Sequence, residues 1–274
     1  MAVLSLLPLT LTVVLLFLTS AFLRLLYILP STHPTPPVPR KRPQNDHQPH
    51  TRLLVVLGSG GHTAEMLAML RELDTSLYTH RSYVVSAGDG FSAQKAREFE
   101  SGLVAKRETG EAGTKMAREQ QKVREGEGVE GAPYDISTVP RARQIHQSLL
   151  TTPLSALHCL WACIQVLRGR PHRETGIEGK ATGMQGVGCG YPDLIISNGP
   201  GTGVCVIFAA LLLRFFGVPG TEGKMRTIYV ESWARVKGLS LSGRILVRCV
   251  DRFLVQWEGL RGLGGRAEYI GVLV

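Results

Sequence analysis

Residues 53–63 read Leu-Leu-Val-Val-Leu-Gly-Ser-Gly-Gly-His-Thr, an apolar run that ends in closely spaced glycines. Five consecutive apolar residues bounded by glycine are typical of a short strand that is buried on both faces. Apolar residues then recur at helical spacing, which predicts a helix over about 63–73. A buried strand, a glycine turn and a helix together form the first unit of a parallel α/β sheet.

The same alternation continues along the chain. Short runs rich in β-branched and other apolar residues predict further strands at 82–86, 193–197, 227–230 and 253–256. Helical periodicity predicts helices at 92–99, 151–167, 204–216 and 239–250. Strands that alternate with helices imply a parallel sheet covered on both faces, so we expect a Rossmann-like, doubly wound domain.

An uncharged stretch of 22 residues precedes this domain, from Ala2 to Leu23. As a helix it would measure about 33 Å, enough to cross a hydrocarbon core of about 30 Å. A cleaved signal peptide is the alternative, because Thr19-Ser20-Ala21 resembles a cleavage site. No basic residue precedes the apolar run and the run is long for a signal peptide, so an anchor is the favoured interpretation.

The basic residues near this segment all follow it, at positions 24, 40, 41, 42 and 52. The positive-inside rule therefore predicts a single-pass protein whose C-terminal domain is cytosolic. We expect an anchor with its flank at 2–29, a Pro-rich linker at 30–51 and one domain at 52–274. Within the domain, residues 101–131 are dense in charge and glycine, and residues 169–190 are rich in glycine, so both are expected to be insertions.

The overall charge is +9 for 274 residues, which favours an anionic partner such as nucleic acid, lipid head groups or a phosphorylated substrate. Hydrophobic residues make up 44% of the chain, which excludes a disordered tail. Between Lys95 and Glu130 eight basic residues are balanced by eight acidic ones, so this insertion is interpreted as a solvated excursion rather than a nucleic-acid arm. The overall charge does not distinguish among these three partners.

The five cysteines are few, odd in number and scattered, which argues against a secreted disulfide scaffold. Cys159 and Cys163 are four residues apart, but no second ligand pair follows them. No carboxylate cluster of the Asp-x-Asp type stands out either. We therefore expect reduced cysteines that fill the core and no metal site in this chain.

Two glycine loops carry the expected ligand chemistry. The first covers 58–63, and the second reads Ser-Asn-Gly-Pro-Gly-Thr-Gly at 197–203, again between a buried strand and an apolar helix. Main-chain N–H groups at a helix N-terminus can bind an oxygen-rich anion. The first loop lacks both the G-x-G-x-x-G spacing and a P-loop lysine, so NAD and ATP are poor candidates. Tight turns that serve packing alone remain the alternative.

A third feature begins at Glu231, directly after the predicted strand at 227–230. Beyond it, Arg244, Arg248 and Arg252 recur at every fourth position, which predicts a basic stripe on one helix face. The stripe has two interpretations, a solvated helix face or a contact with lipid phosphate.

Taken together, these motifs resemble a known family. They occur in order as Gly58–Thr63, Asp89 with Ser92 and Lys95, Val139–Arg141 through Gln147-Ser148, Asn198–Thr202, Tyr229–Ser232, Leu239–Gly243, Asp251–Phe253 with Val255–Trp257, and Tyr269–Gly271. The set resembles the membrane-anchoring, acceptor-binding subunit of the eukaryotic UDP-N-acetylglucosamine transferase of asparagine-linked glycosylation. The resemblance covers 52–274, interrupted by the two insertions.

The resemblance implies a fold, a reaction and partners. The fold would be the N-terminal, acceptor half of a GT-B glycosyltransferase that is split between two chains. The partner would be a soluble catalytic subunit that binds UDP-N-acetylglucosamine, so this chain would hold no firmly bound cofactor, and a need for Mg²⁺ is left open. Together the subunits would add the second N-acetylglucosamine to dolichyl-diphosphate-N-acetylglucosamine at the cytosolic face of the endoplasmic reticulum, whose membrane is continuous with that of the nucleus. Nucleic acid would not be a partner.

The resemblance also implies site residues. His62 and Glu231 are the catalytic candidates, His62 as a base, as a hydrogen-bond donor or as a structural residue at the helix start. The acceptor diphosphate would be bound by Gly58, Ser59, Gly60, Gly61, Thr63, Asn198, Gly199, Gly201, Thr202 and Arg244. The partner would be contacted by the last six residues, Tyr269, Ile270, Gly271, Val272, Leu273 and Val274.

Two other functions are compatible with the residues. The chain could be a self-sufficient membrane-anchored glycosyltransferase or sugar-nucleotide enzyme that uses both glycine loops. It could also be a scaffold whose site has decayed. The self-sufficient enzyme would transfer sugar without a partner. The scaffold would leave the activity of the complex intact when His62 or Glu231 is replaced by alanine.

Overall fold

The computed structural model describes residues 2–30, 51–75, 77–110, 134–144, 147–148, 150–169 and 190–274. Most of the predicted linker at 30–51 and of the predicted loop at 169–190 lies outside these ranges, as do residues 111–131 of the other insertion.

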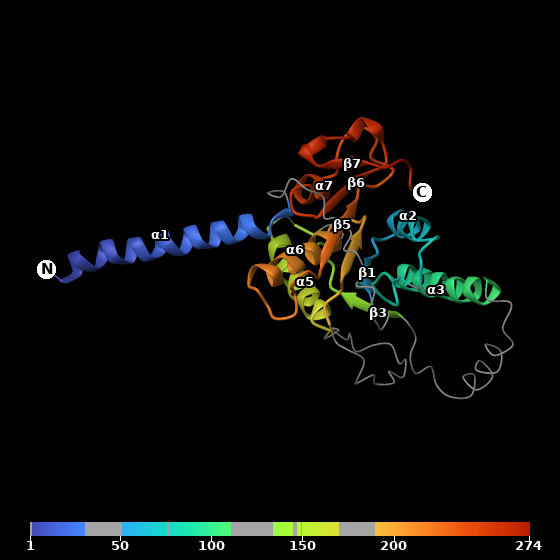
Figure 1. Cartoon of the computed structure of the whole chain (residues 1–274), viewed down its shortest axis with the longest axis horizontal. Helices are drawn as coiled ribbons and strands as arrows, with labels where there is room; N and C mark the ends of the chain where they lie inside the picture. The colour runs from blue at the N-terminus through green and yellow to red at the C-terminus, as the bar shows by residue number, and fades with distance from the viewer. Residues whose placement is uncertain are drawn as a thin grey trace, which may run out of the picture.

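The described residues form one parallel sheet of seven strands in the order β3-β2-β1-β4-β5-β6-β7 (Figure 1). The strands are β1 (Arg52–Val56), β2 (His80–Ser86), β3 (Tyr134–Val139), β4 (Leu194–Ser197), β5 (Arg226–Val230), β6 (Arg252–Val255) and β7 (Ala267–Tyr269). The chain first builds outward from β1 to β3 and then returns to the other side of β1 with β4. The boundary between β1 and β4 is therefore the point where the strand order reverses.

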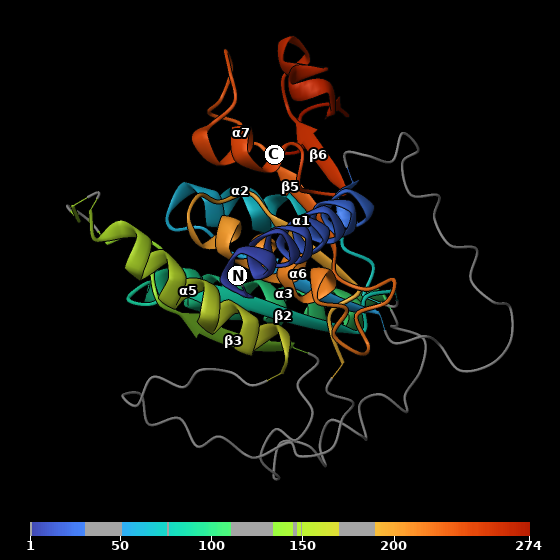
Figure 2. The ribbon, with the colours of Figure 1, turned by 90° about the vertical axis from the view of Figure 1, so that its left-hand side faces the viewer.

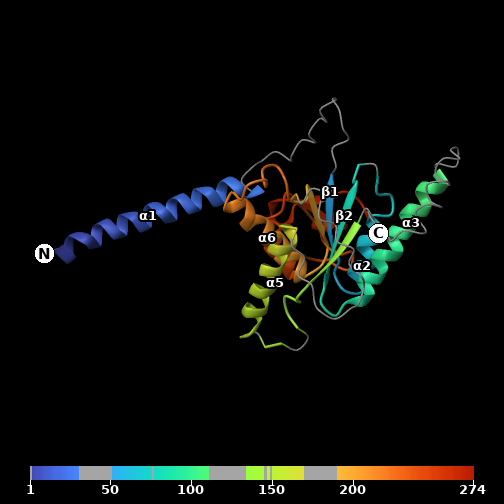
Figure 3. The ribbon, with the colours of Figure 1, turned by 90° about the horizontal axis from the view of Figure 1, so that it is seen from below.

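Helices cover both faces of the sheet, as the alternation of apolar runs predicts. One face carries α5 (Thr152–Leu167) and α6 (Thr202–Phe215), and the other carries α2 (Gly61–Met69) and α3 (Gly90–Gly110) (Figure 3). Helix α7 (Leu241–Leu246) packs on the same face as α6. Val55 of β1 faces the α2 side and Val56 faces the α5–α6 side, and both are fully buried. This burial explains the uninterrupted apolar run in β1, since neither face of that strand meets water.

The doubly wound fold is confirmed, and several elements differ from prediction. Strand β3 was not predicted because it is an edge strand with alternating burial, directly after the charged insertion. Strand β7 has only three residues. Helix α3 continues to Gly110, so the first ten residues of the predicted insertion 101–131 are helical. The predicted helix 239–250 is too long, because α7 ends at Leu246.

A buried ion pair fastens α3 to β2. Arg81 of β2 donates from Nε and Nη2 to the two carboxylate oxygens of Glu100, both at 2.7 Å, and Tyr83 donates its hydroxyl to the same carboxylate at 2.7 Å. The side chains of Arg81 and Glu100 are 3% and 1% exposed. Burial first, and the adjacent carboxylate second, raise the pKa of Tyr83, so its hydroxyl remains a donor.

Helix α1 (Ala2–Ile28) projects away from the domain (Figure 1). Its residues 10–28 are long and apolar enough to cross a membrane, and every side chain from Thr10 to Ser20 is exposed. The domain end of α1 is fixed to α6: Arg24 donates from Nε to the carbonyl of Phe215 at 3.1 Å and from Nη2 to that of Arg214 at 3.1 Å. Arg214 donates in return to the carbonyl of Ile28 at 3.3 Å.

Candidate functional site

The two predicted glycine loops meet at the reversal of strand order. The first follows β1 and leads into α2, and the second follows the neighbouring strand β4 and leads into α6 on the opposite face. Gly60 and Gly201 stand directly before these helices with φ of 63° and 65°. This left-handed conformation favours glycine. Both helix N-termini therefore reach the same sheet edge, where ligands of open α/β sheets bind.

The loops touch through their backbones. A Cβ atom added to Gly199 would lie 2.9 Å from the Cα of Gly58, and one added to Gly58 would lie 2.7 Å from the Cβ of His62. Glycine is thus required at both positions by close approach. Gly61 differs, since a Cβ there would meet nothing within 4 Å.

A cavity of about 420 Å³ opens beside these loops. Of the predicted diphosphate ligands, five line it: Gly58, Ser59, Gly199, Gly201 and Thr202. The other walls are the segment after β3 and the segment at 240–242. Thr202 shares a 2.7 Å hydrogen bond between its hydroxyl and that of Ser86, which joins the second loop to the end of β2.

The charge of the cavity is entirely positive. Arg141, Arg143 and Arg235 line it, and no lining residue is acidic. Arg141 is held in place by a 2.9 Å hydrogen bond from its Nε to the carbonyl of Ala87. Guanidinium groups and main-chain N–H groups are the usual ligands of phosphate oxygens, so the cavity suits an anion of that kind.

Sequence reasoning did not assign these arginines to the site. Arg141 and Arg143 follow β3, the edge strand that was not predicted, so nothing placed them at the sheet edge. Arg235 follows β5, in a segment where the sequence singled out only Glu231.

The remaining predicted ligands lie outside the cavity lining. Thr63 is fully buried, and its hydroxyl contacts the carbonyl of Gly58 and the hydroxyl of Ser92, the latter at 2.7 Å. Thr63 therefore shapes the first loop. Asn198 is also buried and donates from Nδ2 to the carbonyl of His62 at 2.7 Å, which ties the second loop to the first. Gly60 and Gly61 complete the turn into α2 without lining the cavity.

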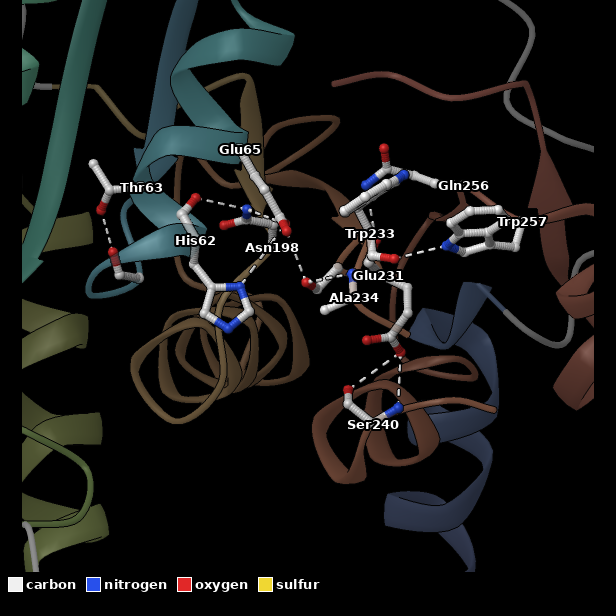
Figure 4. Close-up of polar contacts among 12 residues, drawn as sticks. His62, Thr63, Glu65, Asn198, Glu231, Trp233, Ala234, Ser240, Gln256 and Trp257 are labelled. Atoms are coloured by element: carbon white, nitrogen blue, oxygen red, sulfur yellow. Dashed lines mark hydrogen bonds and ion pairs between the residues drawn. The ribbon is translucent and has the colours of Figure 1, made fainter. Parts of the chain in front are cut away.

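His62 lies on the first turn of α2 (Figure 4). It follows the cavity-lining residues Gly58 and Ser59 but does not line the cavity itself. Its side chain is 30% exposed, and its Nδ1 atom makes no hydrogen bond to the described residues. The nearest carboxylate oxygen is Oε2 of Glu65, 4.0 Å from Nδ1. His62 is thus accessible and has a carboxylate behind it, an arrangement that suits proton transfer or hydrogen bonding to a substrate.

Glu65 is a site residue that sequence reasoning missed. It accepts a hydrogen bond from the hydroxyl of Ser232 at 2.9 Å and one from Nδ2 of Asn198 at 3.4 Å (Figure 4). It therefore joins α2 to the loops after β4 and β5. The available signal was its position three residues after His62, which places both on one helix face.

Glu231 is 1% exposed, and its carboxylate is directed toward Ser240 (Figure 4). Its Oε2 atom accepts hydrogen bonds from the main-chain N and the hydroxyl of Ser240, at 3.1 and 3.2 Å. Oε1 has no partner among the described residues. The geometry gives Glu231 a positioning role, since Ser240 caps α7 and lines the cavity.

The predicted arginine stripe is wrong. Arg244 lies on α7 but Arg248 follows its end, and Arg252 begins β6, where it pairs with Glu268 at 2.6 Å. Arg244 itself is exposed and lines a shallow hollow formed with residues 234–239, next to the cavity.

The C-terminal tail is apolar and largely exposed. Tyr269 ends β7, and the side chains of Ile270, Val272 and Val274 are about half exposed. The main-chain N of Leu273 donates to Oε1 of Gln256 at 3.1 Å, which holds the tail against the loop after β6. Gly271 has φ of 97°, which turns the chain there. The role of these residues in partner binding stays a prediction.

The described cysteines are free, and Cys159, Cys163 and Cys205 are buried in the core between α5, α6 and the sheet. Hydrogen bonding to a neighbouring thiol, together with burial, raises the pKa of Cys159 and of Cys205. Within the described ranges, no group of three or more His, Cys, Asp or Glu side chains could hold a metal ion.

Comparison with known proteins assigns the family. The sequence model of the family described as "Oligosaccharide biosynthesis protein Alg14 like" matches residues 53–273. The chain belongs to the Alg14 family. The match contains both glycine loops, all three cavity arginines and most of the tail.

Curated members of the Alg14 family match over most of their length. "UDP-N-acetylglucosamine transferase subunit alg14" of Aspergillus fumigatus is 40% identical over 246 residues, covering 76% of this chain and 100% of that protein. The subunit of the same name from Schizosaccharomyces pombe is 38% identical, over 85% of this chain and 86% of that protein. "UDP-N-acetylglucosamine transferase subunit ALG14" of Homo sapiens is 34% identical, over 81% and 82%.

Among solved structures, a crystal structure of Acinetobacter baumannii MurG aligns with a TM-score of 0.41 and 9% identity. The alignment covers 81% of this chain and 45% of that chain. A likeness at this level carries no argument about function.

Proposed function

We propose that this chain is the membrane-anchoring subunit of a two-chain UDP-N-acetylglucosamine transferase in N-glycan precursor synthesis. It recruits a soluble catalytic subunit to the endoplasmic reticulum membrane and helps to add the second N-acetylglucosamine to dolichyl-diphosphate-N-acetylglucosamine. The observation that carries this proposal is the match of the whole domain to a family whose curated members are named as subunits of that transferase.

The cavity supports a diphosphate-linked acceptor. The N-terminus of α6, the turn at Gly58 and Ser59, and three arginines line it, so both charges of a diphosphate can be met by N–H donors. The glycines of both loops leave the backbone accessible. His62 stands at the rim of this cavity, where it can contact the acceptor sugar and take or share the proton of the attacking hydroxyl.

The donor enters through the partner in this proposal. The family resemblance implies that the soluble subunit binds UDP-N-acetylglucosamine, so this chain is proposed to hold no cofactor of its own. The chain then serves as the acceptor half of a GT-B transferase. The exposed apolar tail at 269–274 is the proposed contact with the soluble subunit.

The anchor is α1. One apolar helix at the N-terminus is long enough to span a membrane, and it is fixed to the domain through Arg24. The basic residues that follow it favour a cytosolic domain by the positive-inside rule. A lipid acceptor is confined to the bilayer, so an anchored acceptor site meets it by diffusion in the membrane plane.

The test is transfer of N-acetylglucosamine from UDP-N-acetylglucosamine to a phytanyl-diphosphate-N-acetylglucosamine acceptor. The full chain is assayed alone and with the soluble subunit. Transfer only in the presence of both chains supports the proposal. Transfer by this chain alone would establish the self-sufficient enzyme instead, and no transfer by the pair would overturn the assigned reaction.

Two variants separate chemistry from assembly. Deleting residues 269–274 should abolish co-purification with the soluble subunit and transfer together. His62→Ala should leave co-purification intact and lower transfer by about 10²-fold or more if His62 acts in proton transfer. Unchanged transfer by His62→Ala would reduce His62 to a structural residue.

A further inference from the structure

The outer face of α5 carries a row of exposed apolar side chains. Leu150 precedes the helix, and Leu154, Leu157 and Trp161 follow at helical spacing, with side chains that are 92%, 77%, 62% and 61% exposed in that order. The inner face of the same helix is buried against α6. A helix that is apolar on its outer face as well needs a second apolar environment there.

The charges around α5 suit a lipid surface. Helix α5 contains no charged residue, and no acidic residue occurs from 140 to 173. Arginines lie on both sides of the helix in the sequence, at 141, 143, 168, 170 and 173. An apolar helix flanked by cations is the composition expected for contact with a bilayer that contains anionic lipid.

The position of α1 determines where the bilayer lies. Arg24 and Arg214 fix the end of α1 to the C-terminal end of α6, and α5 packs along α6. Seen down α1, helix α5 lies on the near side of the domain and runs crosswise to α1 (Figure 2). The opposite side of the sheet is covered by α2 and α3 (Figure 3). The outer face of α5 is therefore on the side of the domain from which α1 projects.

We propose that α5 is a second membrane contact, lying flat in the boundary between head groups and acyl chains of the leaflet that α1 enters. The inference rests on α1 being the anchor of the proposed function, and it is independent of the sugar and of the acceptor. The segment after β3 leads from the cavity arginines Arg141 and Arg143 to the start of α5. This contact would hold the cavity mouth at the level of the lipid head groups, where a lipid-linked diphosphate lies.

Trp161 reports on this contact directly. The chain has three tryptophans, none of them in α1. The full chain is reconstituted in phosphatidylcholine vesicles that contain phosphatidylinositol, with either ordinary or brominated acyl chains. Bromine quenches tryptophan fluorescence only on close approach. We expect brominated lipid to quench the wild-type protein and Trp161→Phe to lose most of that quenching.

Trp233→Phe is the matched control. Trp233 is 48% exposed on the loop after β5, so its removal should leave the quenching intact. Leu154→Ser with Leu157→Ser should reduce the quenching of Trp161 without lowering thermal stability, because both side chains are already exposed. Unchanged thermal stability establishes that this variant is folded.

Three results would overturn the inference. Equal quenching in wild type and Trp161→Phe means that α5 stays out of the lipid. Loss of Trp161 quenching on addition of the soluble subunit means that the face binds protein. If the chain does not float with the vesicles, α1 is not a membrane anchor, and the proposed function fails as well. That outcome is distinct from a failure of α5 alone, in which the chain still floats.

Discussion

Removal of one partner from the buried ion pair between α3 and β2 provides a stringent stability test. The Arg81 side chain is 3% exposed in the intact protein. In Glu100→Ala its guanidinium would lose two hydrogen bonds of 2.7 Å, and the hydroxyl of Tyr83 would lose its acceptor. The contact from Arg81 to the carbonyl of Tyr78 at 2.9 Å would remain, but it carries no compensating charge.

The expected loss is large. Breaking a buried pair by deleting one partner costs about 3–5 kcal/mol, because an uncompensated charge is left inside the protein. For a domain of this size each kcal/mol shifts the melting temperature by about 2–4 °C, so the variant should melt about 6–20 °C lower. The double substitution Arg81→Met with Glu100→Met should recover much of this loss, since apolar groups of similar volume can replace a buried pair.

Thermal unfolding of the full chain in detergent, followed by tryptophan fluorescence, measures the shift. Glu98→Ala is the control, because Glu98 also lies on α3 and also pairs at 2.7 Å, with Lys95, but both side chains are nearly half exposed. No measurable shift is expected there, since water screens the exposed pair. If Glu100→Ala melted as high as Glu98→Ala, the buried pair would not exist in solution.

The glycine loops and the missed carboxylate give two more predictions. Gly199→Ala should destabilise the chain by about 1–3 kcal/mol, since the new Cβ would meet the Gly58 backbone at 2.9 Å. Gly61→Ala has free space and a helical position, so it should be neutral or stabilising in the same unfolding measurement; equal melting of both variants would refute the close approach. Glu65→Ala should lower turnover by the two-chain enzyme about tenfold, equivalent to about 1.4 kcal/mol, with Glu65→Gln retaining more activity. Wild-type turnover in Glu65→Ala would show that its links to Asn198 and Ser232 do not position the site.

The centre of the sheet could be predicted from sequence because its strands are buried on both faces. Continuous apolar runs identify β1 and β4, and the glycines that follow each run place two turns at one sheet edge. Strand β3 was not predicted, because an edge strand needs only partial burial and its apolar pattern is therefore weak. The cavity arginines at 141 and 143 were not assigned to the site either, because β3 is the strand that brings them to this edge of the sheet.

Side-chain contacts between segments that are distant in the sequence could not be predicted. Glu65 contacts Ser232, which is 167 positions away in the chain, and no local pattern encodes that contact. The arginine stripe failed for a related reason. A spacing of four residues predicts one helix face only while the helix lasts, and the turn after Leu246 leads Arg252 into β6 instead. Periodicity describes an element but not its end.

The backbone contact between the two glycine loops has an evolutionary consequence. Where the groups offered to a ligand are main-chain amides, selection acts on the path of the backbone. Ser59 lines the cavity and is exposed, so substitution there should be tolerated, whereas Gly58 and Gly199 each leave no room for a Cβ atom beside the backbone of the other loop. Distant relatives can therefore vary the side chains of the two loops and keep the same backbone path, provided that both glycines are retained.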